Sequence, residues 1–263
     1  MSDGSAAFAG LVAAHHARTP PRTGSLIVTI FGMVALPATA PIRLSDLQDW
    51  LAALEIEPGL VRTALSRLVA DGTLLRERDG KAALYRLSDR AQRDFRQAAD
   101  LIFGREIPRP TGFMHLALLE EGSPRTKLRA VLSEAGFVPL APNLVVSPEH
   151  AGVPVSLPAG CLLLRSEANA DLAARAPSLW PLTALQEGYR AVLEHARALE
   201  AESSTLGPGR GFLARILLVH EFRRIVLRDP FLPAELLPKN WPGAAARQAL
   251  DRALAAIARQ NMR

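Results

Sequence analysis

The sequence predicts an α+β protein of several domains, and three observations carry this prediction. Residues 42–87 read as two helices separated by a turn and followed by two short extended runs, which is the order of a winged helix-turn-helix. Extended and helical patterns then alternate over residues 113–176, and only helical patterns follow from residue 183. A chain of 263 residues is long enough to hold two or three such domains.

The expected domain boundaries fall where these patterns break. Residues 1–21 are small and polar and end in Pro20-Pro21, which predicts a flexible tail in which His15-His16 is solvated rather than a metal site. We expect a winged helix-turn-helix DNA-binding domain over residues 22–106 and a ferredoxin-like α/β sandwich over residues 107–181. A helical C-terminal domain is expected over residues 182–263.

Within the first domain, apolar periodicity and turn residues define the elements. A supporting helix is expected from Thr23 to before Pro37, and a second helix begins near Ser45. Pro58 and Gly59 set the entry to the third helix, and Asp79-Gly80 favours a type I′ turn between the two extended runs. A linking helix over residues 88–103 ends the domain, and residues 107–110 then read as a linker.

The third helix has one apolar and one polar face at 3.6 residues per turn. The apolar face holds Val61, Ala64, Leu65 and Leu68, and the opposite face holds Arg62, Thr63, Ser66 and Arg67. Arginine can form bidentate bonds with guanine or phosphate, and hydroxyl groups can bond phosphates or base edges. This face therefore predicts a reader of the DNA major groove, with a merely solvated basic face as the alternative.

The predicted hairpin supports DNA binding. Its turn is flanked by Arg76, Arg78 and Lys81, at the place where a wing reaches the phosphate backbone or the minor groove. Glu77 and Asp79 dilute this charge, so we expect modest affinity for each module. A dimer that reads two half-sites would compensate for it.

Composition permits a polyanionic partner without requiring one. The net charge is +5, and residues 209–263 hold 10 Lys and Arg against 4 Asp and Glu. The lone Cys161 excludes an intramolecular disulfide framework and a multi-cysteine metal cage, and its neighbours Leu162, Leu163 and Leu164 predict a buried strand.

Several classes of protein are disfavoured by what the sequence lacks. No stretch approaches the ~18 apolar residues of a membrane span, and the N-terminus does not read as a secretory signal, so we expect a cytoplasmic protein. The nucleophile-elbow, P-loop and zincin motifs do not occur. We therefore expect no enzyme activity, no cofactor and no metal site.

Three stretches of the chain resemble the PaaX family of transcriptional repressors of phenylacetic acid catabolism. They are Gly24 to Gly32 with Val61 to Gly72, then Leu132 to Pro148, and then Leu218 to Arg224 with Arg228-Asp229-Pro230, Leu232 to Pro238 and Trp241-Pro242-Gly243. The resemblance implies a cytoplasmic bacterial repressor that dimerises and binds double-stranded operator DNA. It also implies a winged-helix N-terminus, a ferredoxin-like middle domain related in fold to Cas2, a helical C-terminal domain, and release by phenylacetyl-CoA.

The middle of the chain departs from the family pattern. The family's Trp-Asp-Gly-x-Trp stretch reads Thr111-Gly112-Phe113-Met114-His115 here, and its Asp-Leu-Pro-Glu segment reads Leu119-Glu120-Glu121-Gly122. The effector is therefore expected to be phenylacetyl-CoA or another acyl-CoA.

Candidate effector residues lie in the third resembling stretch: His220, Glu221, Arg223, Arg224 and Arg228. Clustered guanidinium groups suit the phosphates of coenzyme A. Two alternatives are a structural network in which Glu221 pairs with Arg224 at i,i+3 and a dimer contact. Similarly, Trp180, Tyr189 and Trp241 either line a pocket for a phenyl ring or belong to the core.

One competing function remains open. The protein is either an effector-released repressor or an acyl-CoA-binding or interaction protein whose winged helix docks protein rather than DNA. The polar face with Arg62 and Arg67 favours the repressor, because a docking module would not need it.

Overall fold

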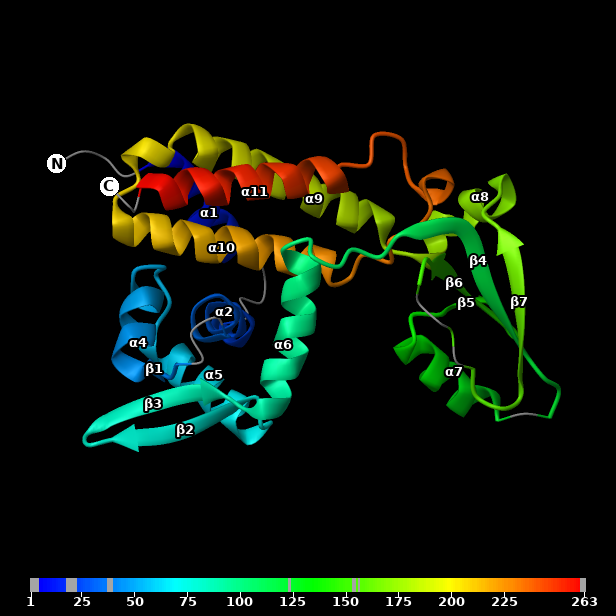
Figure 1. Ribbon diagram of the computed structural model, residues 1–263, viewed down its shortest axis with the longest axis horizontal. Coiled ribbons are helices and arrows are strands. Elements are labelled where there is room, and N and C mark those ends of the chain that lie inside the picture. The colour runs from blue at the N-terminus through cyan, green and yellow to red at the C-terminus, as the bar shows by residue number, and fades with distance from the viewer. Residues whose placement is uncertain are drawn as a thin grey trace. The chain divides into compact units, whose positions relative to one another are not determined.

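The computed structural model describes residues 5–17, 23–36, 40–122, 124–152, 155 and 157–260. The chain divides into two compact units (Figure 1). Unit 1 comprises Met1–Arg105, Gly188–Leu227 and Gly243–Arg263, and unit 2 comprises Glu106–Glu187 and Arg228–Pro242. Helices and two antiparallel sheets confirm the α+β prediction. The division differs from three consecutive domains, because most of the C-terminal helical segment clusters with the N-terminal residues.

The first difference from expectation is helix α1 (Ala6–His16), which occupies the predicted tail. Ser5 caps it by accepting a hydrogen bond from the backbone N–H of Phe8 at 3.2 Å. Ala7, Leu11 and His15 recur every four residues and are buried, so one face of α1 packs against α10 (Pro208–Val226). The prediction of a flexible tail is wrong for this segment, whereas Pro20-Pro21 lies outside the described residues.

The helices and strands predicted over residues 23–103 occur in the predicted order, and the structure adds a short strand, β1, that was not predicted. Helix α2 (Thr23–Ile30) continues into a π-helical turn, η1 (Phe31–Ala35), and is followed by β1 (Ile42–Arg43), α4 (Leu44–Ala52), α5 (Pro58–Ala70), β2 (Leu74–Asp79), β3 (Ala82–Leu87) and α6 (Asp89–Ile102). The three strands form an antiparallel sheet in the order β1-β3-β2. Ser88 caps α6 through its hydroxyl group, which accepts from the N–H of Ala91.

The hairpin turn differs in type from the prediction. Asp79 pairs with Ala82, so the two central residues of the turn are Gly80 and Lys81. Gly80 has a φ of 58°, and Lys81 is not among the residues with positive φ. A glycine with positive φ only at the first central position is the pattern of a type II′ turn, whereas type I′ needs positive φ at both positions.

A tight turn between α4 and α5 sets the direction in which α5 begins. The N–H of Ile56 donates to the carbonyl of Leu51, and the N–H of Glu55 donates to that of Ala52, each at 2.9 Å. This pair of bonds is a Schellman motif with Glu55 in the left-handed region at a φ of 59°. Leu51 and Ile56 are both buried, which adds the hydrophobic contact that accompanies the motif.

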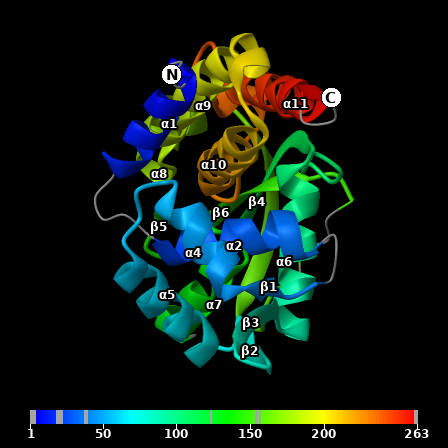
Figure 2. The same ribbon diagram turned by 90° about the vertical axis from the view of Figure 1, so that its left-hand side faces the viewer.

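The helical part of unit 1 is built around α10. From Gly188 on, this unit also holds most of α9 (Leu182–Ala201), whose first residues belong to unit 2, together with η2 (Ser203–Thr205) and α11 (Gly243–Gln260). Apolar residues occur on all sides of α10, as expected of a buried helix. In Figure 2, α10 lies in the middle of the helices of this unit, and it contacts α1, α2, α6 and α11.

Unit 2 is a four-stranded antiparallel sheet with helices. Its elements are β4 (Pro110–Leu119), α7 (Arg125–Glu134), β5 (Val138–Ala141), β6 (Leu144–His150), β7 (Cys161–Glu167), α8 (Ala170–Leu179) and η3 (Ala234–Leu236). The strand order β5-β6-β4-β7 inserts β6 between β4 and β5, so β4, α7 and β5 form a split β-α-β unit. Its core includes Leu128, Leu132, Phe137 and Val145. Helix α8 follows β7 instead of connecting β6 to β7.

Strand β7 lies at the edge of this sheet, which corrects the expectation of a buried strand. Leu162, Leu163 and Leu164 are 52%, 41% and 43% exposed, and Cys161 is only partly buried. β7 pairs with β4 alone, so its other edge has no strand partner within the described sheet. An apolar run of this length is also compatible with a strand covered from both sides, and the sequence alone did not separate the two cases.

The described helices include no segment that is both long enough and apolar enough to span a membrane.

We expect Glu55→Gly to raise the free energy of unfolding by about 1 kcal/mol, because glycine adopts the left-handed conformation without the clash of a Cβ atom. Urea unfolding monitored by circular dichroism measures this change. The matched control is Ala53→Gly, at an exposed position with a φ of −67°, and this substitution should lower stability. A Glu55→Gly protein no more stable than the parent would contradict the assignment of strain to Glu55.

Candidate nucleic-acid interface

Helix α5 presents the polar face that the sequence predicts. Its apolar residues Val61, Ala64, Leu65 and Leu68 are buried, where α5 packs against α2 and α4. The four residues of the opposite face, Arg62, Thr63, Ser66 and Arg67, are all exposed. The Thr63 hydroxyl donates to the carbonyl of Gly59 at 2.9 Å, so its lone pairs and its methyl group remain available to a partner.

The hairpin adds cationic side chains close to α5, because β2 follows α5 directly and packs against it. Arg76 and Arg78 alternate with Glu77 along β2, so the two arginines share one face of the strand. Arg76, Arg78 and Lys81 are all exposed.

Glu77, which was expected to dilute the positive charge of the hairpin, has a cationic partner of its own. Its carboxylate forms an ion pair with Arg86 on the neighbouring strand β3. The pairing takes Glu77 toward β3, whereas exposed Asp79 remains beside Arg78 at the turn, so the modest affinity expected for each module stays a prediction. The surface formed by the exposed α5 residues and the hairpin therefore offers four guanidinium groups and one ammonium group to a polyanion.

The five predicted effector residues do not form one open surface. His220 and Glu221 are 2% and 1% exposed and lie inside the helices of unit 1. Arg223 and Arg224 are partly buried on the same helix, whereas Arg228 is exposed and belongs to unit 2. A CoA ester cannot reach His220 or Glu221 unless neighbouring helices separate.

His220 is held by hydrogen bonding between α10 and α2. Its Nδ1 lies 2.9 Å from the hydroxyl oxygen of Thr29, which itself donates to the carbonyl of Ser25 at 3.2 Å. Burial lowers the pKa of His220 to about 3, against an opposing influence from the carboxylate of Glu221. This is the structural role that a single histidine on a helix usually has.

Glu221 takes part in the ion-pair network that was the alternative to effector binding. Its Oε2 lies 3.8 Å from Arg224 one turn further along α10, so the i,i+3 pairing is confirmed. Its Oε1 lies 3.6 Å from Nδ1 of His15 on α1. The sequence did not reveal this second partner, because residues 1–21 were expected to form a tail.

Arg223 does not join the ion pairs of Glu221 described above, and lies at a small pocket instead. It lines a pocket of about 40 Å³ between α2, η1, α6 and α10, together with apolar residues that include Met33, Phe95 and Phe103. Its guanidinium donates to the Ser25 hydroxyl at 3.4 Å, and burial lowers its pKa.

Of the aromatic residues considered for a phenyl pocket, Trp180 and Tyr189 are buried core residues.

The segment that departs from the family's tryptophan-rich motif contributes to a polar cluster on unit 2. Arg165 on β7 binds Glu149 on β6 through two bonds of 2.6 and 3.0 Å, and Thr111 donates to the same carboxylate at 3.0 Å. The bonds from Arg165 lower the pKa of Glu149 to about 2. Arg165 also lies 3.4 Å above the ring of Phe113. These residues thus pack against one another.

The fold and this basic surface define an α+β protein with an exposed helix and hairpin suited to a polyanion. Comparisons with known proteins then identify the chain as a member of the PaaX family. Residues 22–91 match the model described as PaaX-like protein, and residues 180–263 match the one described as PaaX-like protein C-terminal domain.

Two similar proteins support this assignment. The chain is 35% identical over 256 residues to the transcriptional repressor PaaX of Escherichia coli (strain K12), covering 89% of this chain and 80% of that protein. It is also similar to the solved structure of the uncharacterized protein Rv0674 from Mycobacterium tuberculosis, with a TM-score of 0.53 and 26% identity, over 90% of this chain and 95% of that chain.

Proposed function

We propose that the protein is a cytoplasmic DNA-binding transcriptional repressor of phenylacetate catabolic genes. The observation that carries the proposal is the exposed face of α5 with Arg62, Thr63, Ser66 and Arg67. The similarity to a repressor of the same family supports it. On this proposal α4, α5 and the β2–β3 hairpin act as a winged helix-turn-helix, and the sheet of unit 2 is a ferredoxin-like domain in which α8 has moved behind the last strand.

The proposed contacts follow from the two elements that carry charge. Helix α5 lies in the major groove, where Arg62 and Arg67 bind guanine edges or phosphates and the hydroxyl groups of Thr63 and Ser66 contact phosphates or bases. The hairpin lies along the backbone of the duplex, with Arg76, Arg78 and Lys81 directed to phosphates.

We expect the double substitution Arg62→Ala plus Arg67→Ala to weaken binding to the upstream operator by about 30-fold or more, since each arginine contact contributes about 1–3 kcal/mol. Electrophoretic mobility shift at fixed ionic strength measures this loss. The matched control is Arg252→Ala plus Arg259→Ala, which removes the same charge from exposed positions on α11. Unchanged affinity in the α5 variant would contradict the assigned face, and absence of specific binding by the parent protein would favour the protein-docking alternative.

The proposed effector is phenylacetyl-CoA or a related acyl-CoA. The pocket beside Arg223 is the candidate contact, because a guanidinium suits a phosphate group and the pocket is otherwise lined by apolar and aromatic side chains. Its walls include α2, which precedes α4 and α5 in the chain, and α6, which follows the β2–β3 hairpin. A ligand that enlarges this small pocket would move the scaffold of α5.

An operator titration tests the effector. Phenylacetyl-CoA should release the protein from operator DNA, whereas free phenylacetate and plain CoA should not. Arg223→Ala should raise the concentration needed for release by roughly 10-fold, as expected for a lost charge-assisted hydrogen bond of about 1.5–3 kcal/mol, while DNA affinity stays unchanged. If none of the three compounds changes binding of the protein to operator DNA, the effector belongs to another class.

We also propose a homodimer, in which β7 of one copy lies against β7 of a second copy. The exposed run Leu162, Leu163 and Leu164 lies on an edge strand, which natural proteins rarely leave uncovered. Two identical edge strands can meet across a twofold axis, and a twofold dimer matches two operator half-sites.

For the dimer, we expect Leu162→Glu to convert the protein to a monomer of 28.3 kDa, because each copy would place a carboxylate in the apolar run that the second copy covers. Light scattering coupled to size-exclusion chromatography distinguishes the two states. Val131→Glu is the matched control, since Val131 is 44% exposed on α7 of the same unit and should leave the dimer intact. A dimeric Leu162→Glu protein would exclude this interface.

A further inference from the structure

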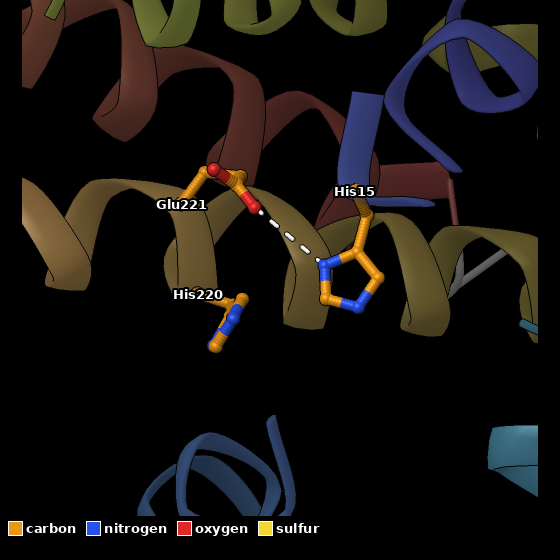
Figure 3. Close-up of side chains that lie close together, drawn as sticks. All are labelled: His15, His220 and Glu221. Carbon is orange, nitrogen blue, oxygen red and sulfur yellow. Dashed lines mark ion pairs between the residues drawn. The ribbon is translucent and has the colours of Figure 1, made fainter. Parts of the chain in front are cut away.

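Helices α1 and α10 bring together three side chains that the proposed function does not use: His15, His220 and Glu221 (Figure 3). One nitrogen or oxygen atom from each residue lies within 4.8 Å of those from the other two. The three residues are 4%, 2% and 1% exposed, so water does not solvate this group as it would on a surface. Arg224 supplies a positive charge 3.8 Å from Oε2 of the Glu221 carboxylate, whereas Oε1 of the same carboxylate faces His15.

Hydrogen bonding sets the tautomer of His220. The Thr29 hydroxyl has one hydrogen, and it donates this hydrogen to the Ser25 carbonyl. With the hydroxyl hydrogen in that position, Thr29 accepts at its contact with His220, and Nδ1 of His220 is the donor. A neutral imidazole protonated on Nδ1 keeps its lone pair on Nε2, which is the form that can bind a metal ion.

His15 and Glu221 are close but are not hydrogen-bonded to each other. Nδ1 of His15 is buried, has no hydrogen-bond partner, and lies 3.6 Å from Oε1 of Glu221. Two ligands at about 2.0–2.1 Å from a tetrahedral zinc ion are about 3.4 Å apart, which is close to this separation. Oε2 of Glu221 lies toward Arg224 at 3.8 Å, so the two oxygens of the carboxylate face different partners.

We propose that His15, His220 and Glu221 bind a divalent transition-metal ion, with Zn²⁺ the best match. Two imidazole nitrogens and one carboxylate oxygen are ligands that zinc accepts, and the fourth position would hold water. Magnesium and calcium fit poorly because both prefer sets of oxygen ligands. Thr29 and Arg224 would orient His220 and Glu221 from outside the ligand shell, as the outer partners of metal ligands commonly do.

The ion would fasten α1 to α10. His15 is the only one of the three ligands on α1, and Thr29, which holds His220, belongs to α2. Metal binding is thus coupled to the docking of the N-terminal helix. The proposal does not depend on the identity of the operator or of the effector.

Direct metal titration of the full-length protein tests the site. After dialysis against EDTA and then against metal-free buffer, Zn²⁺ is titrated in competition with a chromophoric chelator, and Co²⁺ is used separately for its visible absorption. We expect one tight site per chain, a rise in the melting temperature on adding Zn²⁺, and a Co²⁺ spectrum characteristic of a low-coordinate site. His15→Gln should weaken binding by more than the roughly 10- to 100-fold that loss of an outer-shell partner causes.

The adjacent residue provides the matched control. His16 lies outside the group, and its Nε2 bonds the carbonyl of Leu54 at 2.8 Å, so His16→Gln should retain the affinity of the parent protein. Glu221→Gln is the second variant and should also lose tight binding, with circular dichroism checking that each variant is folded. The proposal is overturned if the parent protein binds no stoichiometric Zn²⁺, or if folded His15→Gln binds it as tightly as the parent.

Discussion

The burial of α10 is the constraint on which unit 1 depends. Its apolar side chains face α1, α2, α6 and α11, and Phe222, Leu217 and Leu218 are completely buried. Each such side chain contributes roughly 1.5–3 kcal/mol by leaving water. Because α10 touches α2, which precedes α4 and α5 in the chain, and α6, which follows the β2–β3 hairpin, it fixes both ends of the scaffold that holds α5.

Polar contacts then determine how the surrounding helices fit this core. Arg247 on α11 donates to the carbonyls of Ile102 and Leu101 at the end of α6, at 2.8 and 3.0 Å, and lies 4.9 Å above the ring of Phe222. The end of a helix leaves carbonyl groups without helical partners, and Arg247 binds that of Ile102 as well as that of Leu101, which also accepts from the N–H of Gly104 at 3.4 Å. His220 makes the corresponding connection from α10 to Thr29 on α2. Apolar packing supplies most of the stability here, and these bonds specify the register of the helices.

The sequence predicted well those features that depend on neighbouring residues. The two faces of α5, the hairpin and the linking helix α6 follow from periodicity and from local turn residues, and all three are present. The family's characteristic stretches led to the same assignment that the comparisons give.

Features that depend on distant residues were missed. Helix α1 did carry a signal, the spacing of Ala7, Leu11 and His15, but its small residues made it resemble a tail. Its contact with Glu221 joins residues about 200 positions apart, and no local pattern reveals such a pair. Similarly, an apolar run such as Leu162 to Leu164 is the same in a central strand and in an edge strand.

The division of the chain has a consequence for biosynthesis. Unit 1 consists of three separated segments, and both segments of unit 2 lie between them in the sequence. Helix α5 therefore leaves the ribosome early, whereas α10 and α11 emerge last. Until they do, the apolar faces of α2 and α6 that will pack on α10 have nothing to cover them. A nascent chain that stalls in unit 2 thus carries the exposed basic helix α5 on an incomplete core, which is a species prone to aggregation and suited to capture by chaperones.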